Sequence, residues 1–198
     1  MTTGAAPSFT ADWSKTRNYW PGMFADLGLP GKPGLRFLEI GCFEGMATVW
    51  LLENVLTGRG SRIDVIDTFT GSDEFDALGV DGDSYERFIR NVEPFSERVA
   101  VRVGESAAIL RTFDAVRTFD FIYVDGSHRA ADVLTDAVLS WPLLKPGCLM
   151  VFDDYRWAPP GEHTFADLPA VGIEAFRAAF GDQLKVLHDT YQFVVEKL

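Results

Sequence analysis

The stretch FLEIGCFEGMATVW, residues 37–50, joins an apolar run to a helical pattern through a turn that holds two glycines. Glu39, Gly41 and Gly45 stand at this turn. Gly41 allows the chain to turn tightly, and Gly45 allows the helix to pack close to whatever lies in the turn. A strand that passes through a glycine turn into a helix is typical of the first unit of an α/β fold.

Further apolar runs, separated by helical patterns, repeat this unit along the chain. Strands are predicted at 35–40, 62–67, 98–103, 119–125 and 148–154, of which 98–103 has the weakest pattern. The helical patterns lie at 44–57, 84–95, 106–116 and 130–141. Helices of this length between short strands imply right-handed crossovers. The sequence therefore predicts an α/β fold with a Rossmann-like, doubly wound and mostly parallel sheet.

The last part of the chain departs from this alternation. A helical pattern at 172–180 is followed by Gly181, which we expect to cap it. The apolar segments 184–189 and 191–198 then have one residue between them, which leaves room only for a tight hairpin. An antiparallel pair of strands is therefore expected to complete the sheet.

The length and composition fit a single globular domain. The chain has 198 residues, of which 47% are hydrophobic, enough for one sizeable core. We read residues 35–198 as that domain and residues 1–34 as a helical, aromatic segment that covers it. Trp13, Tyr19 and Trp20 are the aromatic residues on which the cover is predicted.

Charge and cysteine content narrow the classes of function. The formal net charge is −11, and so acidic a surface repels phosphate backbones, which argues against a nucleic-acid partner. No apolar run reaches the roughly 18 residues of a membrane span, and the first twenty residues lack a secretory signal pattern. Cys42 and Cys148 both lie in apolar segments, and two buried thiols in a chain of this length are typical of a protein from a reducing compartment. We expect a cytoplasmic protein without a membrane partner; whether it forms a homo-oligomer stays open.

An acid on the second strand completes a first candidate site. Asp67 ends that strand, where a carboxylate can accept hydrogen bonds from both ribose hydroxyls of an adenosine. The glycine turn lacks the third glycine of G-x-G-x-x-G, and Glu44 is expected at the helix N-terminus, where it competes with a phosphate. A glycine turn and a strand-end aspartate each also have structural explanations. Together they favour an adenosine site without a diphosphate.

At this point the chain, over residues 35–198, resembles the class I S-adenosylmethionine-dependent methyltransferases. The motifs that carry the resemblance are EIGxxxG at 39–45, DGxH at 125–128 and the terminal hairpin. The resemblance implies a seven-stranded sheet with an antiparallel last strand, and S-adenosylmethionine as cofactor. It also implies the cofactor-binding residues, which are Glu39, Gly41, Gly45, Asp67, Thr68, Phe69, Gly104, Glu105, Ser106 and Asp125.

Within that set, three positions belong to the methionine end of the cofactor, namely Glu39, Gly41 and Gly45, and Asp67 to its ribose. The turn formed by Gly104, Glu105 and Ser106 resembles the adenine-side turn after the third strand. Ser106 is also compatible with a purely structural role as the N-cap of the next helix.

Three carboxylates mark a second candidate site. Asp125 ends the fourth strand, and Asp153 and Asp154 end the fifth, so their side chains are expected in one small volume. Three ionised carboxylates repel unless a cation compensates, and oxygen ligands select Mg²⁺ or another hard divalent cation. The alternative is structural: Asp125 stabilises a turn, and Asp154 caps or pairs with Arg156.

His128 follows Asp125 at the same edge, and the ordinary pKa of imidazole suits proton abstraction near neutrality. The resemblance to metal-assisted methyltransferases implies that His128 is the general base. The leading hypothesis is therefore metal-assisted O-methylation of a hydroxyl on a small molecule. The alternatives are a metal-independent methyltransferase, a nicotinamide-dependent oxidoreductase, and a non-catalytic protein that binds the nucleoside cofactor.

Overall fold

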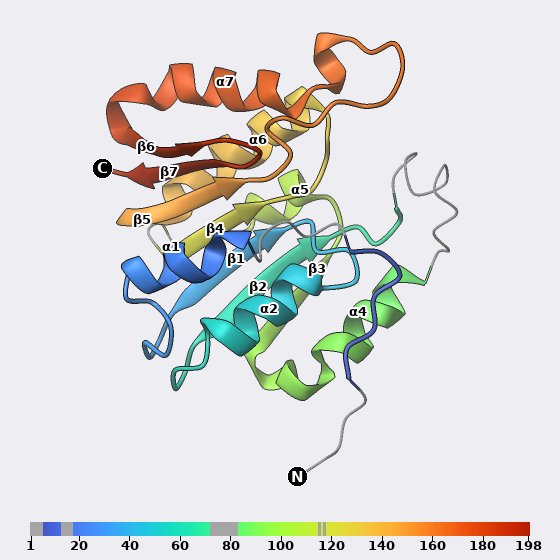
Figure 1. Cartoon of the computed structure of the whole chain (residues 1–198), viewed down its shortest axis with the longest axis vertical. Coiled ribbons are helices and arrows are strands. Elements are labelled where there is room, and N and C mark those ends of the chain that lie inside the picture. The colour runs from blue at the N-terminus through green and yellow to red at the C-terminus, as the bar shows by residue number, and fades with distance from the viewer. Residues whose placement is uncertain (1–5, 13–17, 72–82, 115, 117) are drawn as a thin grey trace.

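A computed structural model of the chain describes residues 6–12, 18–71, 83–114, 116 and 118–198. Its centre is one seven-stranded sheet with the order β3-β2-β1-β4-β5-β7-β6 (Figure 1). The strands are β1 Arg36–Ile40, β2 Arg62–Asp67, β3 Val99–Val103, β4 Phe119–Val124, β5 Leu144–Phe152, β6 Leu184–Asp189 and β7 Phe193–Lys197. The first five pair in parallel, and β7 pairs antiparallel with both β5 and β6. The predicted Rossmann-like α/β fold is confirmed.

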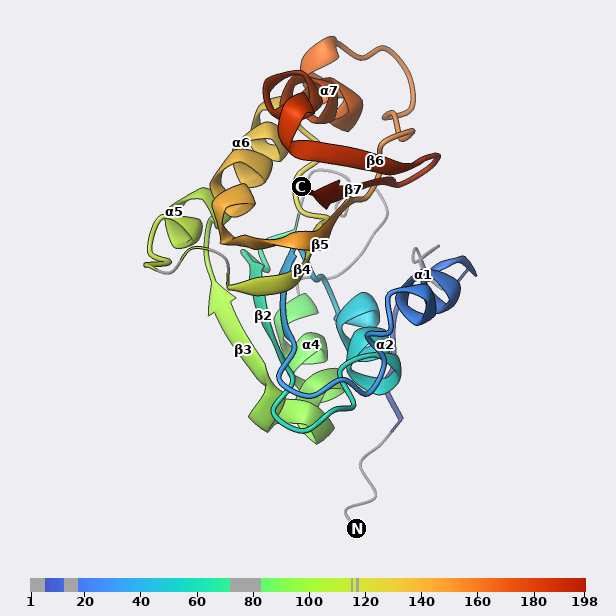
Figure 2. The same cartoon turned by 90° about the vertical axis from the view of Figure 1, so that its left-hand side faces the viewer.

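Helices cover both faces of the sheet (Figure 2). One face carries α1 Trp20–Asp26, α2 Met46–Asn54 and α4 Ser84–Val92, and the other carries α5 Ser106–Leu110, α6 Ala130–Ser140 and α7 Pro169–Phe180. Short 3₁₀ turns lie at Glu93–Arg98, Trp141–Leu143, Phe165–Asp167 and Gly181–Gln183. Two apolar cores result, one on each side of the sheet. None of the helices in the described ranges is long and apolar enough to cross a bilayer.

Several predicted boundaries move. The helix predicted at 106–116 ends at Leu110, because Phe113 folds back against Phe119 at the start of β4. The strand predicted from Cys148 begins four residues earlier, at Leu144. Pro146 and Gly147 are unusual residues inside a strand, and here they lie at an irregularity of β5, where the register against β4 shifts.

The terminal hairpin is present, with a longer connection than predicted. Residues 190–192 join β6 to β7, because the second strand begins at Phe193 rather than at Tyr191. Gln192 is buried in this connection. Gly181 follows α7 as predicted, but its backbone is right-handed and starts a 3₁₀ turn instead of a left-handed cap.

The N-terminal segment packs on the α2 face of the sheet. Trp20 and Phe24 of α1 are fully buried, and Trp20 lies edge-on against Phe121 and Tyr123 of β4. The predicted contribution of Trp13 to the cover lies outside the described residues. The division of the chain at residue 35 stays a prediction.

Candidate active site

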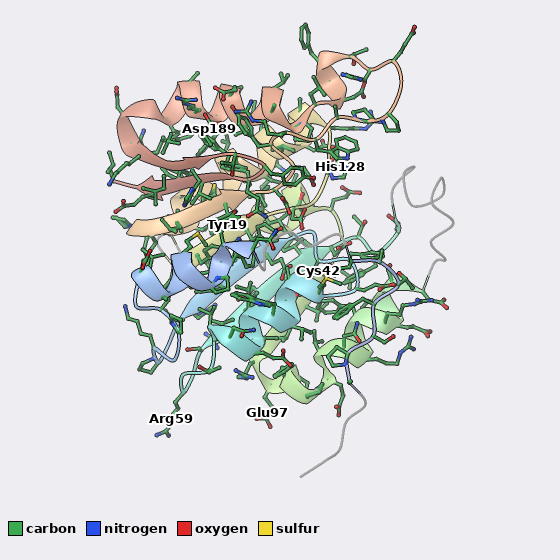
Figure 3. The ribbon with its side chains drawn as sticks, in the orientation of Figure 1. Tyr19, Cys42, Arg59, Glu97, His128 and Asp189 are labelled. Atoms are coloured by element: carbon green, nitrogen blue, oxygen red, sulfur yellow. The ribbon has the colours of Figure 1, made fainter. Side chains whose placement is uncertain are left out.

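A cavity of about 550 Å³ opens at the carboxyl ends of β1, β2 and β4 and at the turn after β3. Figure 3 shows Cys42 and His128 at this end of the molecule, and Arg59 and Glu97 at the opposite end. The cavity is lined by nine of the predicted site residues, namely Gly41, Asp67, Thr68, Phe69, Gly104, Glu105, Ser106, Asp125 and His128. Four others, Glu39, Gly45, Asp153 and Asp154, are not among its lining residues. The structure thus brings most of the predicted residues into one concave site.

Asp67 is held by the backbone around it. Its Oδ2 accepts hydrogen bonds from the amides of Cys42 at 2.7 Å and Phe43 at 2.9 Å. Its Oδ1 accepts from the amide of Phe69 at 2.7 Å. Each carboxylate oxygen has two lone pairs, so Oδ2 is saturated by its two donors and Oδ1 keeps one lone pair for a ligand hydroxyl. The carboxylate therefore links the turn after β1 to the turn after β2 and still faces the cavity.

The two glycines of the first turn are needed by the protein's own packing. Gly41 has φ +81°, and a Cβ added there would lie 2.0 Å from the carbonyl oxygen of Asp125. Gly45 has φ +85°, and its Cβ would lie 2.9 Å from the ring of Phe88. Gly41 therefore lets β1 and β4 end side by side, and Gly45 admits an aromatic side chain of α4.

Three residues other than glycine have a left-handed backbone conformation at this edge of the sheet. Phe43, Phe69 and Asp154 have φ of 47°, 53° and 55°, and each lies in the turn that follows a parallel strand. Such conformations are uncommon for non-glycine residues and concentrate at functional sites. The strained positions therefore coincide with the edge where the predicted site residues gather.

The two glutamates of the first motif point away from the cavity. Glu39 is buried and accepts a 2.6 Å hydrogen bond from Thr48 Oγ1, and its Oε1 has no hydrogen-bond partner among the residues that the structure describes. Burial raises the pKa of Glu39 to about 8. Glu44 does not occupy the helix N-terminus as expected; its carboxylate instead accepts from the amide and hydroxyl of Thr10, both at 2.7 Å. Glu44 therefore fastens the N-terminal segment and is not placed to compete with a phosphate.

The turn after β3 contacts Asp136, an acidic residue that was not predicted from the sequence to belong to the site. Ser106 is the first residue of α5, with Glu105 at the N-cap position, so Ser106 is not the N-cap. The Ser106 hydroxyl donates a 2.6 Å hydrogen bond to Oδ1 of Asp136 in α6. Asp136 lines the cavity, is 2% exposed, and has a pKa raised by burial to about 6. The signal available in the sequence was an acid on the otherwise buried face of the helix at 130–141.

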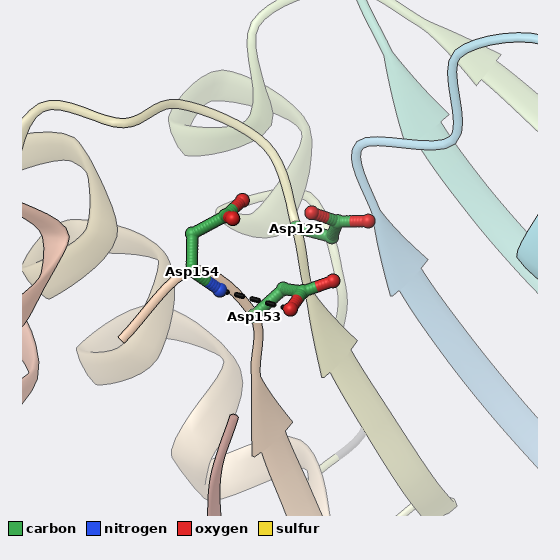
Figure 4. A group of neighbouring side chains, drawn as sticks. All are labelled: Asp125, Asp153 and Asp154. Carbon is green, nitrogen blue, oxygen red and sulfur yellow. Dashed lines mark hydrogen bonds between the residues drawn. The ribbon is translucent and has the colours of Figure 1, made fainter. Parts of the chain in front are cut away.

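Asp125, Asp153 and Asp154 lie together beyond β4 and β5 (Figure 4). Each offers a carboxylate oxygen within 4.8 Å of the others. Tyr123 donates a short hydrogen bond to Asp153 Oδ2, and Tyr191 donates one of 2.5 Å to Asp154 Oδ1. Burial and then the charge of a neighbouring carboxylate raise the pKa of Asp125, and likewise that of Asp153. The predicted convergence of the three acids is present.

His128 lies between this cluster and the cavity. Its Nε2 is 2.9 Å from Oδ2 of Asp154, and its ring stacks on Trp157 with centroids 4.3 Å apart. Arg156 does not pair with Asp154; its side chain bonds Asp189 at 2.6 Å. The imidazole is thus oriented by a carboxylate on one side and an indole face on the other.

The chemistry of the cluster fits a hard divalent cation. Two ligand oxygens on one ion are at most twice the metal–oxygen distance apart, which is about 5 Å for Ca²⁺ and about 4 Å for Mg²⁺. The three carboxylate oxygens lie within 4.8 Å of one another, so they meet the limit for Ca²⁺ and would have to close slightly around Mg²⁺. Burial first, and then the neighbouring carboxylates, raise the pKa of Asp125 and Asp153, and a cation would offset the repulsion between these carboxylates.

Residues 38–155 match a family described as a methyltransferase domain. A curated relative, the uncharacterized protein R132 of Acanthamoeba polyphaga mimivirus, is 26% identical over 133 residues, which are 65% of this chain and 56% of the relative. The chain thus spans little more than half the length of that relative.

Solved structures share the fold. The O-methyltransferase TomG from Streptomyces achromogenes, in complex with S-adenosylmethionine, has a TM-score of 0.66 at 18% identity, over 94% of this chain and 81% of its own. An O-methyltransferase from Bacillus cereus, in complex with S-adenosylhomocysteine, has a TM-score of 0.62 at 18% identity, over 96% and 84%. At these identities the likeness shows the fold.

Proposed function

The chain belongs to the methyltransferase-domain family, and we propose that it transfers a methyl group from S-adenosylmethionine to a hydroxyl of a small molecule with the help of a divalent cation. The observation that carries the finer part of this proposal is the convergence of Asp125, Asp153 and Asp154 beside a cofactor-sized cavity.

The cavity supports the choice of cofactor. Asp67 offers the remaining lone pair of its Oδ1 to a ribose hydroxyl, and Ser106, Glu105 and Asp136 place polar groups at the adjoining turn. A sulfonium carries a positive charge, which suits a cavity that acidic side chains line. The solved O-methyltransferases with this fold hold S-adenosylmethionine or S-adenosylhomocysteine.

In this proposal the cation is held by Asp125, Asp153 and Asp154. When bound, it would lower the pKa of the acceptor hydroxyl. Asp125 lines the cavity as well, so the cluster adjoins the space in which an acceptor and the methyl donor would meet. The acidic net charge of −11 disfavours a nucleic-acid acceptor and leaves a small molecule as the proposed substrate.

His128 is proposed as the general base. A carboxylate only accepts hydrogen bonds, so the Nε2–H of a neutral His128 donates to Asp154, and Nδ1 becomes the proton-accepting atom. The acceptor O–H gives its proton to the imidazole, and the oxygen attacks the methyl carbon. The carbon–sulfur bond breaks with its electron pair going to sulfur, which leaves S-adenosylhomocysteine and a methyl ether.

The test is methyl transfer from S-adenosylmethionine to a panel of vicinal diols, with Mg²⁺ or with EDTA. His128→Ala should lower turnover by about 10²–10⁴-fold, the usual contribution of a general base. Its affinity for S-adenosylhomocysteine should stay within about twofold. His163→Ala is the control, because His163 also lines the cavity but bonds its own loop at Gly161. Equal turnover in the His128 variant and wild type would remove the base assignment.

A metal-independent methyltransferase is the second candidate, favoured by one observation. Asp153 and Asp154 already accept hydrogen bonds from Tyr123, Tyr191 and His128. Full activity in EDTA would favour this reading. The family match argues against the nicotinamide-dependent alternative, and absence of transfer to every acceptor would favour a non-catalytic binder.

A further inference from the structure

We propose that Trp20, Gln192 and Tyr123 form a hydrogen-bonded chain that positions Asp153 for cation binding, an inference that rests on the proposed function. These residues come from helix α1, the β6–β7 connection and β4. They are 0%, 1% and 1% exposed, so the chain runs through the interior of the protein. Trp20 and Gln192 lie outside residues 38–155, the range that matches the family.

The contacts are continuous from the N-terminal helix to the cluster. Trp20 Nε1 donates to Gln192 Oε1 at 3.0 Å, and the Tyr19 hydroxyl donates to the same oxygen. Gln192 Nε2 donates to the Tyr123 hydroxyl at 3.4 Å. The Tyr123 hydroxyl then donates to Asp153 Oδ2.

The direction of this chain is fixed at its first member. An indole N–H is a donor only, so the carboxamide of Gln192 must turn its oxygen toward Trp20 and its NH₂ toward Tyr123. The hydroxyl of Tyr123 receives a hydrogen from that NH₂, so its own proton is directed to Asp153. Each link thus determines the role of the next.

Asp153 is the end point, and both its oxygens accept. Oδ2 accepts from Tyr123, and Oδ1 accepts from the backbone amide of Asp154 at 2.9 Å (Figure 4). Two acceptor contacts fix the plane of a carboxylate and leave one lone pair on each oxygen. Tyr123, Gln192 and Trp20 are therefore positioning residues, acting through Asp153 on the geometry presented to the ion.

The first test is calorimetric titration of Mg²⁺ and Mn²⁺ onto Tyr123→Phe. Loss of an outer hydrogen bond to a metal ligand typically weakens metal binding by about 10–100-fold, and we expect a change in that range. Tyr155→Phe is the matched control, because Tyr155 is also buried but its hydroxyl donates to Glu174. The control should change cation affinity less than about twofold.

Gln192→Met tests the chain one link further away. It keeps the size of the side chain but removes the donor to Tyr123, and we expect cation affinity to fall by about tenfold. In the double variant with Tyr123→Phe the loss should be smaller than the product of the single losses, because both act through Asp153. Affinity for S-adenosylhomocysteine should stay within about twofold throughout, which a general loss of structure would not allow.

Cation-free crystal structures separate this inference from the proposed function. In both variants the Asp153 carboxylate should leave its place between Asp125 and Asp154. If wild type bound neither cation, the metal part of the proposed function would fail, and the position of Asp153 would still decide the inference. An unmoved Asp153 in both variants, or wild-type cation affinity in both, would overturn it.

Discussion

Asp67 ends β2 and Asp154 lies just beyond β5, at the same edge of the sheet, yet the protein holds the two acids differently. Asp67 accepts hydrogen bonds from three backbone amides, whereas Asp154 accepts from the side chains of Tyr191 and His128. Backbone donors are present whenever the fold is present. Side-chain donors can be altered by one substitution while the fold stays unchanged. The proposed nucleoside half of the site is therefore held by the backbone of the fold, and the proposed cation-binding half depends on the side chains of Tyr191 and His128.

The largest expected effect concerns Gly41, where the turn after β1 meets the end of β4 and the two halves of the proposed site adjoin. Gly41→Ala puts a Cβ 2.0 Å from the Asp125 carbonyl oxygen, at φ +81°. We expect a loss of at least about 3 kcal/mol in the free energy of unfolding, from overpacking and backbone strain together. Gly147→Ala is the control, with φ +73° and no atom within 4 Å of the added Cβ. It should lose about 1–2 kcal/mol in urea denaturation. Similar losses in the two variants would contradict the close approach.

The next largest effect concerns the backbone-held acid. Asp67→Ala should weaken S-adenosylhomocysteine binding by about 10–100-fold. A hydrogen bond to a charged group contributes about 1.5–3 kcal/mol, which corresponds to a change in affinity of that size. Asp120→Ala is the control, since Asp120 also accepts a backbone amide, that of Arg36 at 2.9 Å, but lies at the other end of the sheet. Calorimetry measures both. Unchanged affinity in Asp67→Ala would remove Asp67 from the cofactor site.

A smaller effect sharpens the comparison on the carboxylate side. Tyr191→Phe removes the 2.5 Å hydrogen bond to Asp154 Oδ1. We expect Mn²⁺ affinity to fall by about tenfold, while S-adenosylhomocysteine affinity stays within about twofold. An equal loss for both ligands would show that the two halves are not independent.

The smallest predicted effect concerns Asp136, an acid beside the proposed nucleoside site. Its carboxylate accepts a hydrogen bond from the side chain of Ser106. Burial raises the pKa of Asp136 from 3.8 to about 6, so its contribution to stability is full below about pH 3.8 and is lost as the pH rises through 6. Asp136→Asn should remove this dependence and raise the free energy of unfolding at pH 7 by about 1–2 kcal/mol.

Urea denaturation at pH 4.5 and pH 7 measures the change. Asp132→Asn, on the same helix but exposed, provides the control. A variant of Asp136 that follows wild type at both pH values would contradict the assignment.

Much of the fold could be predicted from the sequence because the central strands are buried on both faces. The apolar runs at 62–67 and 119–125 match β2 and β4 almost residue for residue. The predicted ends of strands and helices were wrong where tertiary contacts override the local conformational preference of the residues. Pro146 and Gly147 normally end a strand, but pairing with β4 carries β5 through them.

The site divides in the same way. Acids that directly follow strands could be found, since the ends of parallel strands meet at one edge. Asp136 and Gln192 were missed, because their roles depend on contacts with distant residues. Gln192 meets Trp20 across 172 positions of sequence, a separation that no local pattern records.

The most direct test of the two-part site is one calorimetric experiment on wild type, Asp67→Ala and Asp153→Ala, each titrated with S-adenosylhomocysteine and with Mg²⁺. We predict that wild type binds both ligands, that Asp67→Ala loses the nucleoside but keeps the ion, and that Asp153→Ala does the reverse. Wild-type Mg²⁺ binding by Asp153→Ala, or loss of both ligands in either variant, would contradict the account.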